Sequence, residues 1–220
     1  MQLAVRLFLV VFGLLFVGLG YYVGVGMAGA ARASADRAER LAPADAAALA
    51  AAAPGGELLI EGVVSPENPA RFRDFVAYVR EEFRGADNNG DERWFEDERV
   101  TPPLAIEAGG RAQLANDDYE LEGPHERWQE EGLEWSRSTE EGTKRYRGLV
   151  AGGPVTAIGT VAPGPAGNEL RAEVVYGGTR EQYIAEKRGL SSLFPAVGLA
   201  IAAAGAALVF VAAWVLRRWR

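Results

Sequence analysis

The chain has 220 residues, with 23 basic and 30 acidic side chains, one histidine and no cysteine. The lack of cysteine excludes disulfides, thiol nucleophiles, iron–sulfur clusters and thiolate zinc sites. The net charge of −7 argues against a nucleic-acid partner, because nucleic-acid binding needs a basic surface. We therefore expect no cofactor, no metal site and no nucleic acid.

Two uncharged apolar stretches lie near the ends of the chain, at residues 7–31 and 189–216. At about 1.5 Å per residue, a helix of either length exceeds the roughly 30 Å hydrocarbon core of a bilayer. The sequence therefore predicts transmembrane helices over residues 3–31 and 189–216. All 30 acidic side chains lie between these stretches, so the central segment carries the acidity. An acidic composition with only two lysines is typical of a halophilic source or of GC-rich codon use.

The first stretch could instead be a cleaved signal peptide, since Arg6 precedes it and small residues end it. Its apolar run is longer than the roughly 7–15 residues of a signal core, which favours a retained span. Tyr21 and Tyr22 are predicted to lie at the membrane interface, where aromatic side chains collect.

The second stretch ends in an aromatic and basic segment with a tail at residues 217–220, which is typical of a cytoplasmic end. Two spans place both termini on one side, so we expect cytoplasmic termini and an extracytoplasmic central domain in the cell membrane. Basic residues also flank the central side, but the rule is weak for a loop this long. Gly198 and Gly205 would allow close helix approach. The predicted interface anchors at this end are Trp214, Arg217, Arg218, Trp219 and Arg220.

Residues 32–56 are rich in alanine and predict a helical linker, broken near Pro43 and ended by a Pro-Gly-Gly sequence. Residues 57–178 then predict a β-rich domain, so the expected fold class is α+β. Within it, residues 122–148 are polar and acidic, and we expect a loop there. Thr179 and Gln182 form a capping box that should begin a short helix over residues 179–188. The expected strands are 57–64, 72–83, 93–100, 104–108, 111–121, 155–161 and 169–176.

Two of these strand regions allow finer predictions. The turn residues 87–90 should join the second and third strands as a hairpin. In the last strand, alternation places Leu170, Ala172, Val174 and Tyr176 on one face.

Several polar groups are candidates for chemical sites. Asp87, Asn89 and Asp91 surround a glycine, but the spacing does not match a calcium loop, and a hairpin turn is favoured. The carboxylates at 96–98 should alternate faces of a strand, so they do not make an acid–base pair. His125 lies in a polar loop without a nucleophile motif and is interpreted as a surface histidine. We therefore predict no catalytic residue.

The tryptophans of the central segment are candidates for packing or for binding. Trp94 lies in an expected strand and is interpreted as core. Trp128 and Trp135 lie in a charged stretch, where they could pack onto the sheet or present a surface to a partner. We take Trp128, Trp135 and Tyr146 as the candidate partner-binding residues.

The order of features resembles the membrane-embedded part of the GIDE/MULAN mitochondrial E3 ubiquitin ligase family. Residues 57–64 are similar to the opening strand of that family's "beside-a-membrane" (BAM, or GIDE-type) domain. Trp94 with the proline-led strand 101–106, the segment from Glu140 to Val161, and Tyr183 before the second span also fit. The resemblance implies a BAM-type domain across the membrane and cytosolic termini. Eukaryotic members carry a zinc-binding RING after the second span, and this chain has no cysteine to build one.

The sequence thus favours a membrane-anchored, non-enzymatic domain that binds or regulates an unidentified protein partner at the outer membrane face. One alternative is a component of the E3 ligase family whose transfer chemistry comes from a separate partner. Another is a carboxylate-based hydrolase. A further alternative is a structural envelope protein, including a homo-oligomer assembled through the spans.

Overall fold

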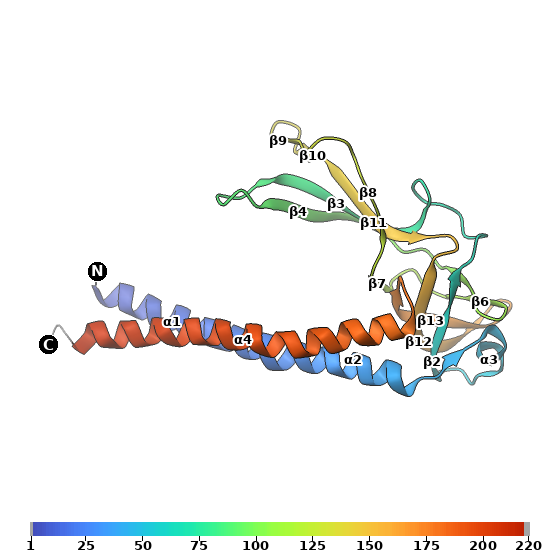
Figure 1. The fold of residues 1–220 in the computed structure, drawn as a ribbon, viewed down its shortest axis with the longest axis horizontal. Coiled ribbons are helices and arrows are strands. Elements are labelled where there is room, and N and C mark those ends of the chain that lie inside the picture. Colours follow the sequence, from blue (N-terminus) through green and yellow to red (C-terminus); the bar gives the residue numbers. More distant parts are fainter. Residues whose placement is uncertain (1, 218–220) are drawn as a thin grey trace. The chain divides into compact units, whose positions relative to one another are not determined.

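The computed structural model describes residues 2–217, with side chains described for 5 and for 7–214. It is a mixed α+β structure with many strands and a long apolar helix near each end, which confirms the expected fold class (Figure 1). The chain divides into two compact units. The helical unit contains Met1–Arg40 and Ile184–Arg220, and the strand domain contains Leu41–Tyr183.

The helical unit is built from two long helical segments. α1 (Gln2–Tyr21) continues through a π-helical segment, η1 (Tyr22–Met27), into α2 (Ala28–Arg40). The returning helix is α4 (Arg180–Arg217), a single helix that includes the expected short helix as its first turns. The capping box is confirmed, because the Thr179 amide donates to Gln182 Oε1 at 2.9 Å and the Gln182 amide to Thr179 Oγ1 at 3.3 Å.

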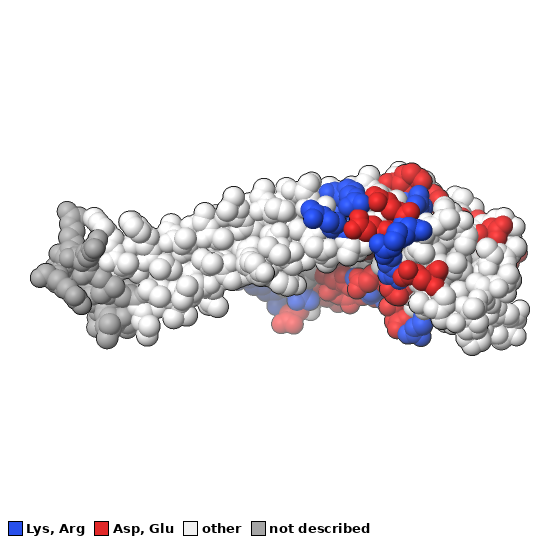
Figure 2. Space-filling view, turned by 90° about the horizontal axis from the view of Figure 1, so that it is seen from below, with Lys and Arg blue, Asp and Glu red and all other residues white. Residues whose placement is uncertain are grey.

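Both helices are long and apolar enough to cross a membrane, over Leu7–Arg40 and Arg180–Trp214. Only 11% and 17% of their apolar windows are buried, so large side chains such as Phe8, Leu199 and Phe210 stand exposed. Figure 2 shows these helices free of charged side chains except toward one end, leaving aside the grey residues. An exposed apolar surface of this extent suits contact with lipid rather than with water.

The two helices meet through small residues. On α4 the buried face repeats every seven residues, at Ser191, Gly198, Gly205 and Ala212. A Cβ atom added to Gly198 would lie 2.4 Å from the Gly20 carbonyl oxygen, and one added to Gly205 would lie 2.5 Å from that of Gly13. This close approach confirms the role expected for both α4 glycines.

The π-helical segment keeps the small residues of the first helix on one face. The buried positions Gly13 and Gly20 are seven residues apart, as are Ala28 and Ala35, but Gly20 and Ala28 are separated by eight. A π turn takes up one extra residue, so η1 absorbs the insertion between the two regular stretches. Without it, the stripe beyond Ala28 would rotate by about 100° away from α4.

The expected linker over residues 32–56 divides between the two units. Residues up to Arg40 continue the helix, and the remainder belongs to the strand domain. There, β1 (Pro43–Ala44) pairs in parallel with the first long strand. α3 (Ala46–Ala51) begins at Asp45, whose Oδ1 accepts the Ala48 amide at 2.7 Å. Leu49 is 2% exposed, so this segment contributes to the core.

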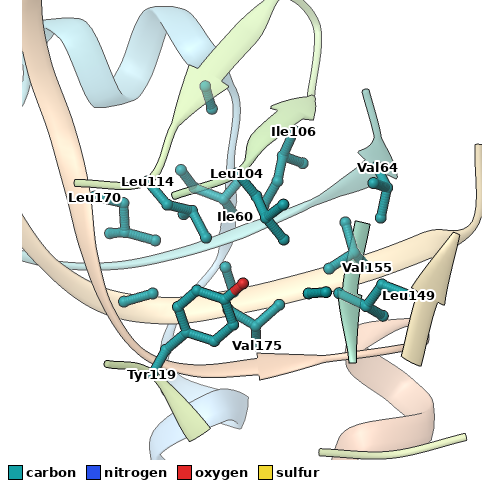
Figure 3. Packing of buried hydrophobic residues seen from close by; sticks show 14 of the residues in the cluster. Ile60, Val64, Leu104, Ile106, Leu114, Tyr119, Leu149, Val155, Leu170 and Val175 are labelled. Atoms are coloured by element: carbon teal, nitrogen blue, oxygen red, sulfur yellow. The ribbon is translucent and has the colours of Figure 1, made fainter. Parts of the chain in front are cut away.

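The first sheet holds the main core. Its strand order is β6 (Arg111–Gln113), β5 (Ala105–Glu107), β2 (Glu57–Val64), β12 (Pro154–Gly164), β13 (Gly167–Tyr176) and β7 (Glu120–Glu122), with β1 beside β2. Figure 3 shows aliphatic side chains, most of them from this sheet or the segments beside it, packed into one cluster with Tyr119 and with Leu149 of the second sheet. The labelled members are Ile60, Val64, Leu104, Ile106, Leu114, Tyr119, Leu149, Val155, Leu170 and Val175.

Two expectations for this sheet need correction. The strand expected over residues 111–121 is interrupted. Its first part is the short β6, which pairs with β5, and its end begins β7, which pairs in parallel with β13. In β13 the alternation breaks, because Ile158 pairs with Val174 and Gly159 with Ala172, leaving Glu173 as a bulge. Val175 is therefore fully buried, whereas Val174 is only half-buried.

The second sheet has the order β4 (Glu92–Val100), β3 (Phe75–Ala86), β11 (Lys144–Val150), β8 (Glu126–Gln129). A small separate hairpin joins β9 (Trp135–Ser136) and β10 (Glu141–Gly142). The loop expected over residues 122–148 is thus wrong, since it contains β8, β9, β10 and most of β11. The hairpin at residues 87–90 is confirmed by the β3–β4 pairing. β3 begins at Phe75 rather than Phe72. Arg73 has a φ of 49°, which is not an extended conformation, so the strand begins after this residue.

Candidate functional site

The second sheet brings together most of the polar and aromatic side chains singled out from the sequence. Residues directly opposite in an antiparallel sheet point to the same face. Tyr146 lies opposite Arg80 and Trp128, whereas Arg147 lies opposite Val79 and Arg127. The sheet therefore has an aromatic face and an arginine face.

The aromatic face is packed rather than open. Phe72 stacks on Tyr146 with 4.1 Å between ring centroids, and Tyr78 and Trp128 lie 5.6 and 5.5 Å from Tyr146. Tyr146 is 6% exposed, so this binding candidate presents little surface. Trp128 is half-buried, with the Arg73 guanidinium 4.3 Å above its ring. Trp135 lies elsewhere, on β9, and does not join the cluster.

Trp94 is a correction to the sequence interpretation. It lies on the edge strand β4, is half-buried and does not join the core clusters. Its indole N–H donates to Glu92 Oε2 at 2.9 Å, and the Arg145 guanidinium lies 4.2 Å from its ring. An edge strand has a neighbour on one side only, so the ring is covered by Phe83, with 5.5 Å between ring centroids, and by Arg145.

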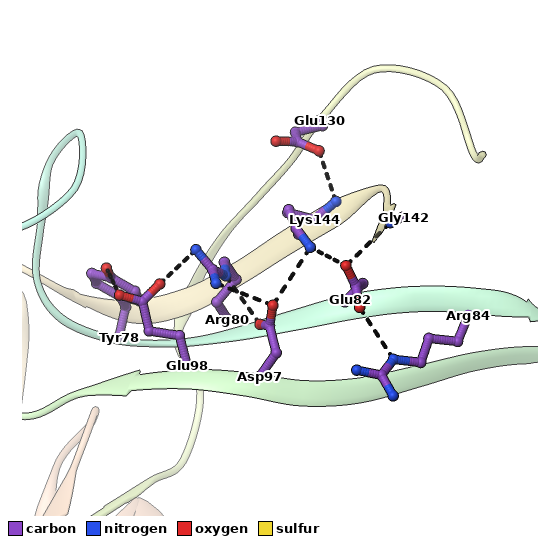
Figure 4. A network of polar contacts seen from close by, with 9 residues as sticks. All are labelled: Tyr78, Arg80, Glu82, Arg84, Asp97, Glu98, Glu130, Gly142 and Lys144. Carbon is purple, nitrogen blue, oxygen red and sulfur yellow. Dashed lines mark hydrogen bonds and ion pairs between the residues drawn. The ribbon is translucent and has the colours of Figure 1, made fainter. Parts of the chain in front are cut away.

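A polar network crosses three strands of this sheet (Figure 4). The Lys144 ammonium on β11 forms an ion pair with Glu82 on β3 and lies 3.5 Å from Asp97 on β4. Arg80 on β3 binds Asp97 at 3.0 Å and Glu98 at 2.6 Å. The network therefore ties β4, β3 and β11 together.

Glu82 is the most buried carboxylate of the network, at 4% exposure. Burial alone would raise the pKa of Glu82, but hydrogen bonds from Lys144, Gly142 and Arg84 outweigh burial and hold its pKa below the usual value. Burial likewise opposes the charge on Lys144, and the hydrogen bond and charge of Glu82 raise the Lys144 pKa. The pair is thus ionised at neutral pH.

The carboxylates at 96–98 are held in ion pairs. Glu96 pairs with Arg99 at 2.8 Å, and Asp97 and Glu98 both bind Arg80. The prediction that these three alternate faces is wrong for the last two, because the register shifts beside Arg80 and leaves Asp97 as a bulge. Among the described residues, no group of three or more acidic or histidine side chains is arranged to hold a metal ion.

The side chain of Asp87 stabilises the hairpin turn that the sequence favoured over a calcium loop. Its Oδ1 accepts the amides of Asn89 at 2.8 Å and Asp91 at 3.0 Å. These two backbone hydrogen bonds lower the pKa of Asp87. The carboxylate is therefore engaged in closing the β3–β4 hairpin.

The arginine face carries a pocket of about 490 Å³, which we call the arginine pocket. Arg127 on β8 lies directly opposite Arg147 on β11. Arg145 is ion-paired with Glu81 at 2.7 Å, but within the described chain Arg127 and Arg147 form no ion pair. The lining residues are Glu81, Arg127, Trp128, Gln129, Arg145 and Arg147.

His125 lies beside this pocket and is a second correction. It is half-buried rather than on the surface, and its Nε2 atom is buried without a hydrogen-bond partner in the described structure. Burial, followed by the positive charges of Arg147 and Arg127, lowers the pKa of His125 to about 4. The imidazole is consequently neutral at physiological pH.

A second pocket, of about 450 Å³, lies near the β3–β4 and β9–β10 hairpins, and we call it the hairpin pocket. Phe95 is 46% exposed, and the Arg84 guanidinium lies 5.4 Å from its ring centroid. Trp135, a sequence candidate for partner binding, lines this pocket. The lining residues are Arg84, Arg93, Phe95, Trp135, Arg137 and Glu140.

The predicted membrane-interface residues lie in the helical unit. Tyr21 and Tyr22 are 69% and 62% exposed at the junction of α1 and η1, and Trp214 is 50% exposed on α4. Arg217 ends α4, and its side chain lies outside the described part. Arg218, Trp219 and Arg220 lie outside the described residues.

Sequence reasoning missed the arginine and hairpin pockets. The alternation of Arg145 and Arg147 about Tyr146 was a readable signal, since period two places both arginines on one strand face. The strand could not be recognised because the segment was interpreted as a loop.

Comparisons with protein-family models, with curated proteins and with solved structures find no match for this chain.

Proposed function

We propose that the chain is a membrane-anchored, non-enzymatic protein whose strand domain binds a protein partner outside the cytoplasm. The observation that carries the proposal is the hairpin pocket, where Phe95 and Trp135 lie among three arginines. Tryptophan, tyrosine and arginine dominate the binding energy of protein interfaces. The cations of this pocket favour a partner that offers acidic side chains.

The anchoring part of the proposal rests on the helical unit. Two exposed apolar helices run antiparallel and pack through small residues, so the start of α1 and the end of α4 lie at the same end of this unit. We propose that this unit crosses the cell membrane twice with both termini in the cytoplasm. The basic residues at the C-terminal end support that orientation.

Assembly through the spans receives less support. The glycines that would let a second copy approach closely already pack between the two long helices of one chain. They are Gly13, Gly20, Gly198 and Gly205. A BAM-type identity for the strand domain is likewise a proposal that rests on sequence features alone. We therefore favour partner binding over assembly as a homo-oligomer and over an E3-type role.

Cross-linking at the hairpin pocket tests the proposal. A photo-reactive residue at Leu133, which is 42% exposed near β9, should capture one protein in native membranes. Replacing Trp135→Ala or Phe95→Ala should reduce that capture at least about tenfold, as expected for interface anchors. Val63→Ala, which alters an exposed apolar side chain on the other sheet, is the matched control. The proposal would be contradicted if neither pocket variant reduced the capture. It would also be contradicted if the control reduced the capture as much as the pocket variants do.

A further inference from the structure

The arginine pocket has a charge opposite to that of the chain around it. The central segment contains all 30 acidic side chains, yet three arginines line this pocket with a single glutamate. That glutamate, Glu81, is engaged by Arg145 at 2.7 Å. Two guanidinium groups, those of Arg127 and Arg147, are therefore left without a carboxylate among the described residues.

These two arginines lie directly opposite one another across β8 and β11. Side chains in such positions have Cβ atoms about 5 Å apart, and like charges there destabilise a sheet. The neighbouring His125 imidazole is neutral, so it adds no further positive charge, and it supplies no negative charge either. The folded domain thus holds an uncompensated pair of positive charges in a pocket.

We propose that the arginine pocket binds a phosphate ester. Guanidinium groups have only hydrogen-bond donors, in a planar fork that matches phosphate oxygens two at a time. A dianionic phosphate would balance both unpaired arginines, whereas a single carboxylate would balance one. The volume of about 490 Å³ leaves room for the esterified group beside the phosphate.

The rest of the domain limits the size of this ligand. Its many carboxylates repel long polyanions such as nucleic acids, which need an extended basic surface. The pocket therefore suits one phosphate group carried by a small molecule or by a lipid headgroup. This inference goes beyond the proposed function and does not depend on any protein at the hairpin pocket.

Binding can be measured on the full chain in nanodiscs. Phenyl phosphate is titrated into protein in phosphatidylcholine discs, and the same protein is compared in discs that also contain phosphatidic acid. His125 is the only histidine, so its labelled imidazole gives a single NMR signal beside the pocket. Saturable binding should raise the His125 pKa, since the phosphate offsets the field of Arg147 and Arg127. A response to phenyl phosphate indicates a soluble ester, and a response only to phosphatidic acid indicates a headgroup.

Charge-removing variants decide whether the arginines are responsible. Arg127→Gln and Arg147→Gln should each weaken binding at least about tenfold, because a charged hydrogen bond is lost in each. Arg71→Gln removes an exposed arginine elsewhere in the domain and should leave binding unchanged. Without ligand, the two pocket variants should melt no lower than the parent chain, since each removes a like-charge contact.

Four results would overturn the inference. The first is no saturable response to either phosphate source. The second is equal weakening in Arg71→Gln. The third is tighter binding of a hexaglutamate peptide than of phenyl phosphate, which would assign the pocket to acidic protein segments. The fourth is a clear loss of thermal stability in both pocket variants, which would show that the charges are compensated.

Discussion

Glu82 shows how a buried charge is kept in this sheet. Three donors surround it: the ammonium of Lys144, the Gly142 amide at 3.1 Å and the Arg84 guanidinium at 3.1 Å. A buried ion is expensive unless it is both paired and hydrogen-bonded. Glu82 satisfies both conditions, so removing one partner should cost more than an exposed ion pair is worth.

Replacing Lys144→Met should destabilise the strand domain by about 2–3 kcal/mol, because Glu82 loses its cation while staying buried. Since the Glu82 pKa is lowered in the folded state, its contribution is present above its unfolded pKa and is lost as pH falls through the folded value. The variant lacks the cation that lowers this pKa, so the difference in stability between the two proteins should shrink as pH falls. Urea unfolding in detergent micelles, followed by tryptophan fluorescence, measures both effects.

Two further variants control this prediction. The double variant Glu82→Gln with Lys144→Met should recover part of the loss, because no buried charge then remains. Arg171→Gln breaks an exposed pair with Asp118 and should have little effect. Equal stability of Lys144→Met and the parent would show that Glu82 does not depend on its cation.

His125 should titrate far below an ordinary histidine. Its folded pKa of about 4 lies below the unfolded value near 6.5, so the unfolded chain binds the extra proton between these limits. Stability should therefore fall as pH drops from about 6.5 to about 4, by up to roughly 3 kcal/mol from this group. The single imidazole NMR signal reports its pKa directly, and a value of 6 or higher would refute the prediction. His125→Gln should remove this part of the pH dependence and leave that of the carboxylates.

At the scale of elements, two kinds of insertion change a regular pattern. η1 adds one residue to a seven-residue spacing of small side chains, and the bulges at Glu173 and Asp97 add one residue to strands of period two. In each case the backbone departs from its regular geometry to take up the extra residue. The π segment preserves the buried stripe, whereas the bulge in β13 exchanges Val174 for Val175 in the core.

Replacing Gly198→Leu should separate the two long helices, because a Cβ atom there meets backbone atoms of Gly20 and Gly24 at 2.4 and 2.5 Å. Spin labels on cysteines at Leu7 and Val211, both exposed, would report the interhelical distance in nanodiscs. The chain has no native cysteine to interfere. We expect a longer and broader distance distribution in the variant.

Gly18→Leu is the matched control, since a Cβ atom at Gly18 meets nothing within 4 Å. Its distance distribution should equal that of the parent chain. If both variants behave alike, the glycine contacts do not set the approach of the helices.

At the scale of the molecule, the strand domain is connected to the helical unit at both of its ends, near Arg40 and Ile184. In the proposed topology both connections lie on the same side of the membrane, so the entire strand domain lies on that side. A cysteine introduced at the exposed Arg137 should react with a membrane-impermeant maleimide in intact cells. A cysteine appended at the C-terminus should react only after permeabilisation, and the reverse pattern would invert the proposed orientation.

The sequence by itself determined the features that depend on local chemistry. The long uncharged helices, the capping box at Thr179, the hairpin at Asp87 and the strand 57–64 result from runs, caps and turn residues that act within a few positions. The α+β class and the close approach at Gly198 and Gly205 were also readable. The segment 122–148 was not, because its strands are short or rich in charged residues, and the alternation in them is of arginine with one aromatic rather than of apolar side chains.

Only the tertiary structure decided which distant residues share a surface. Three features depend on pairing between strands that do not follow one another directly in the chain: the burial of Glu82, the neutral imidazole of His125 and the opposition of Arg127 to Arg147. A one-residue bulge or shift of register would move any of these groups to the other face. The partner-binding and phosphate sites proposed for this protein therefore come from strand register, which a composition or a local motif does not encode.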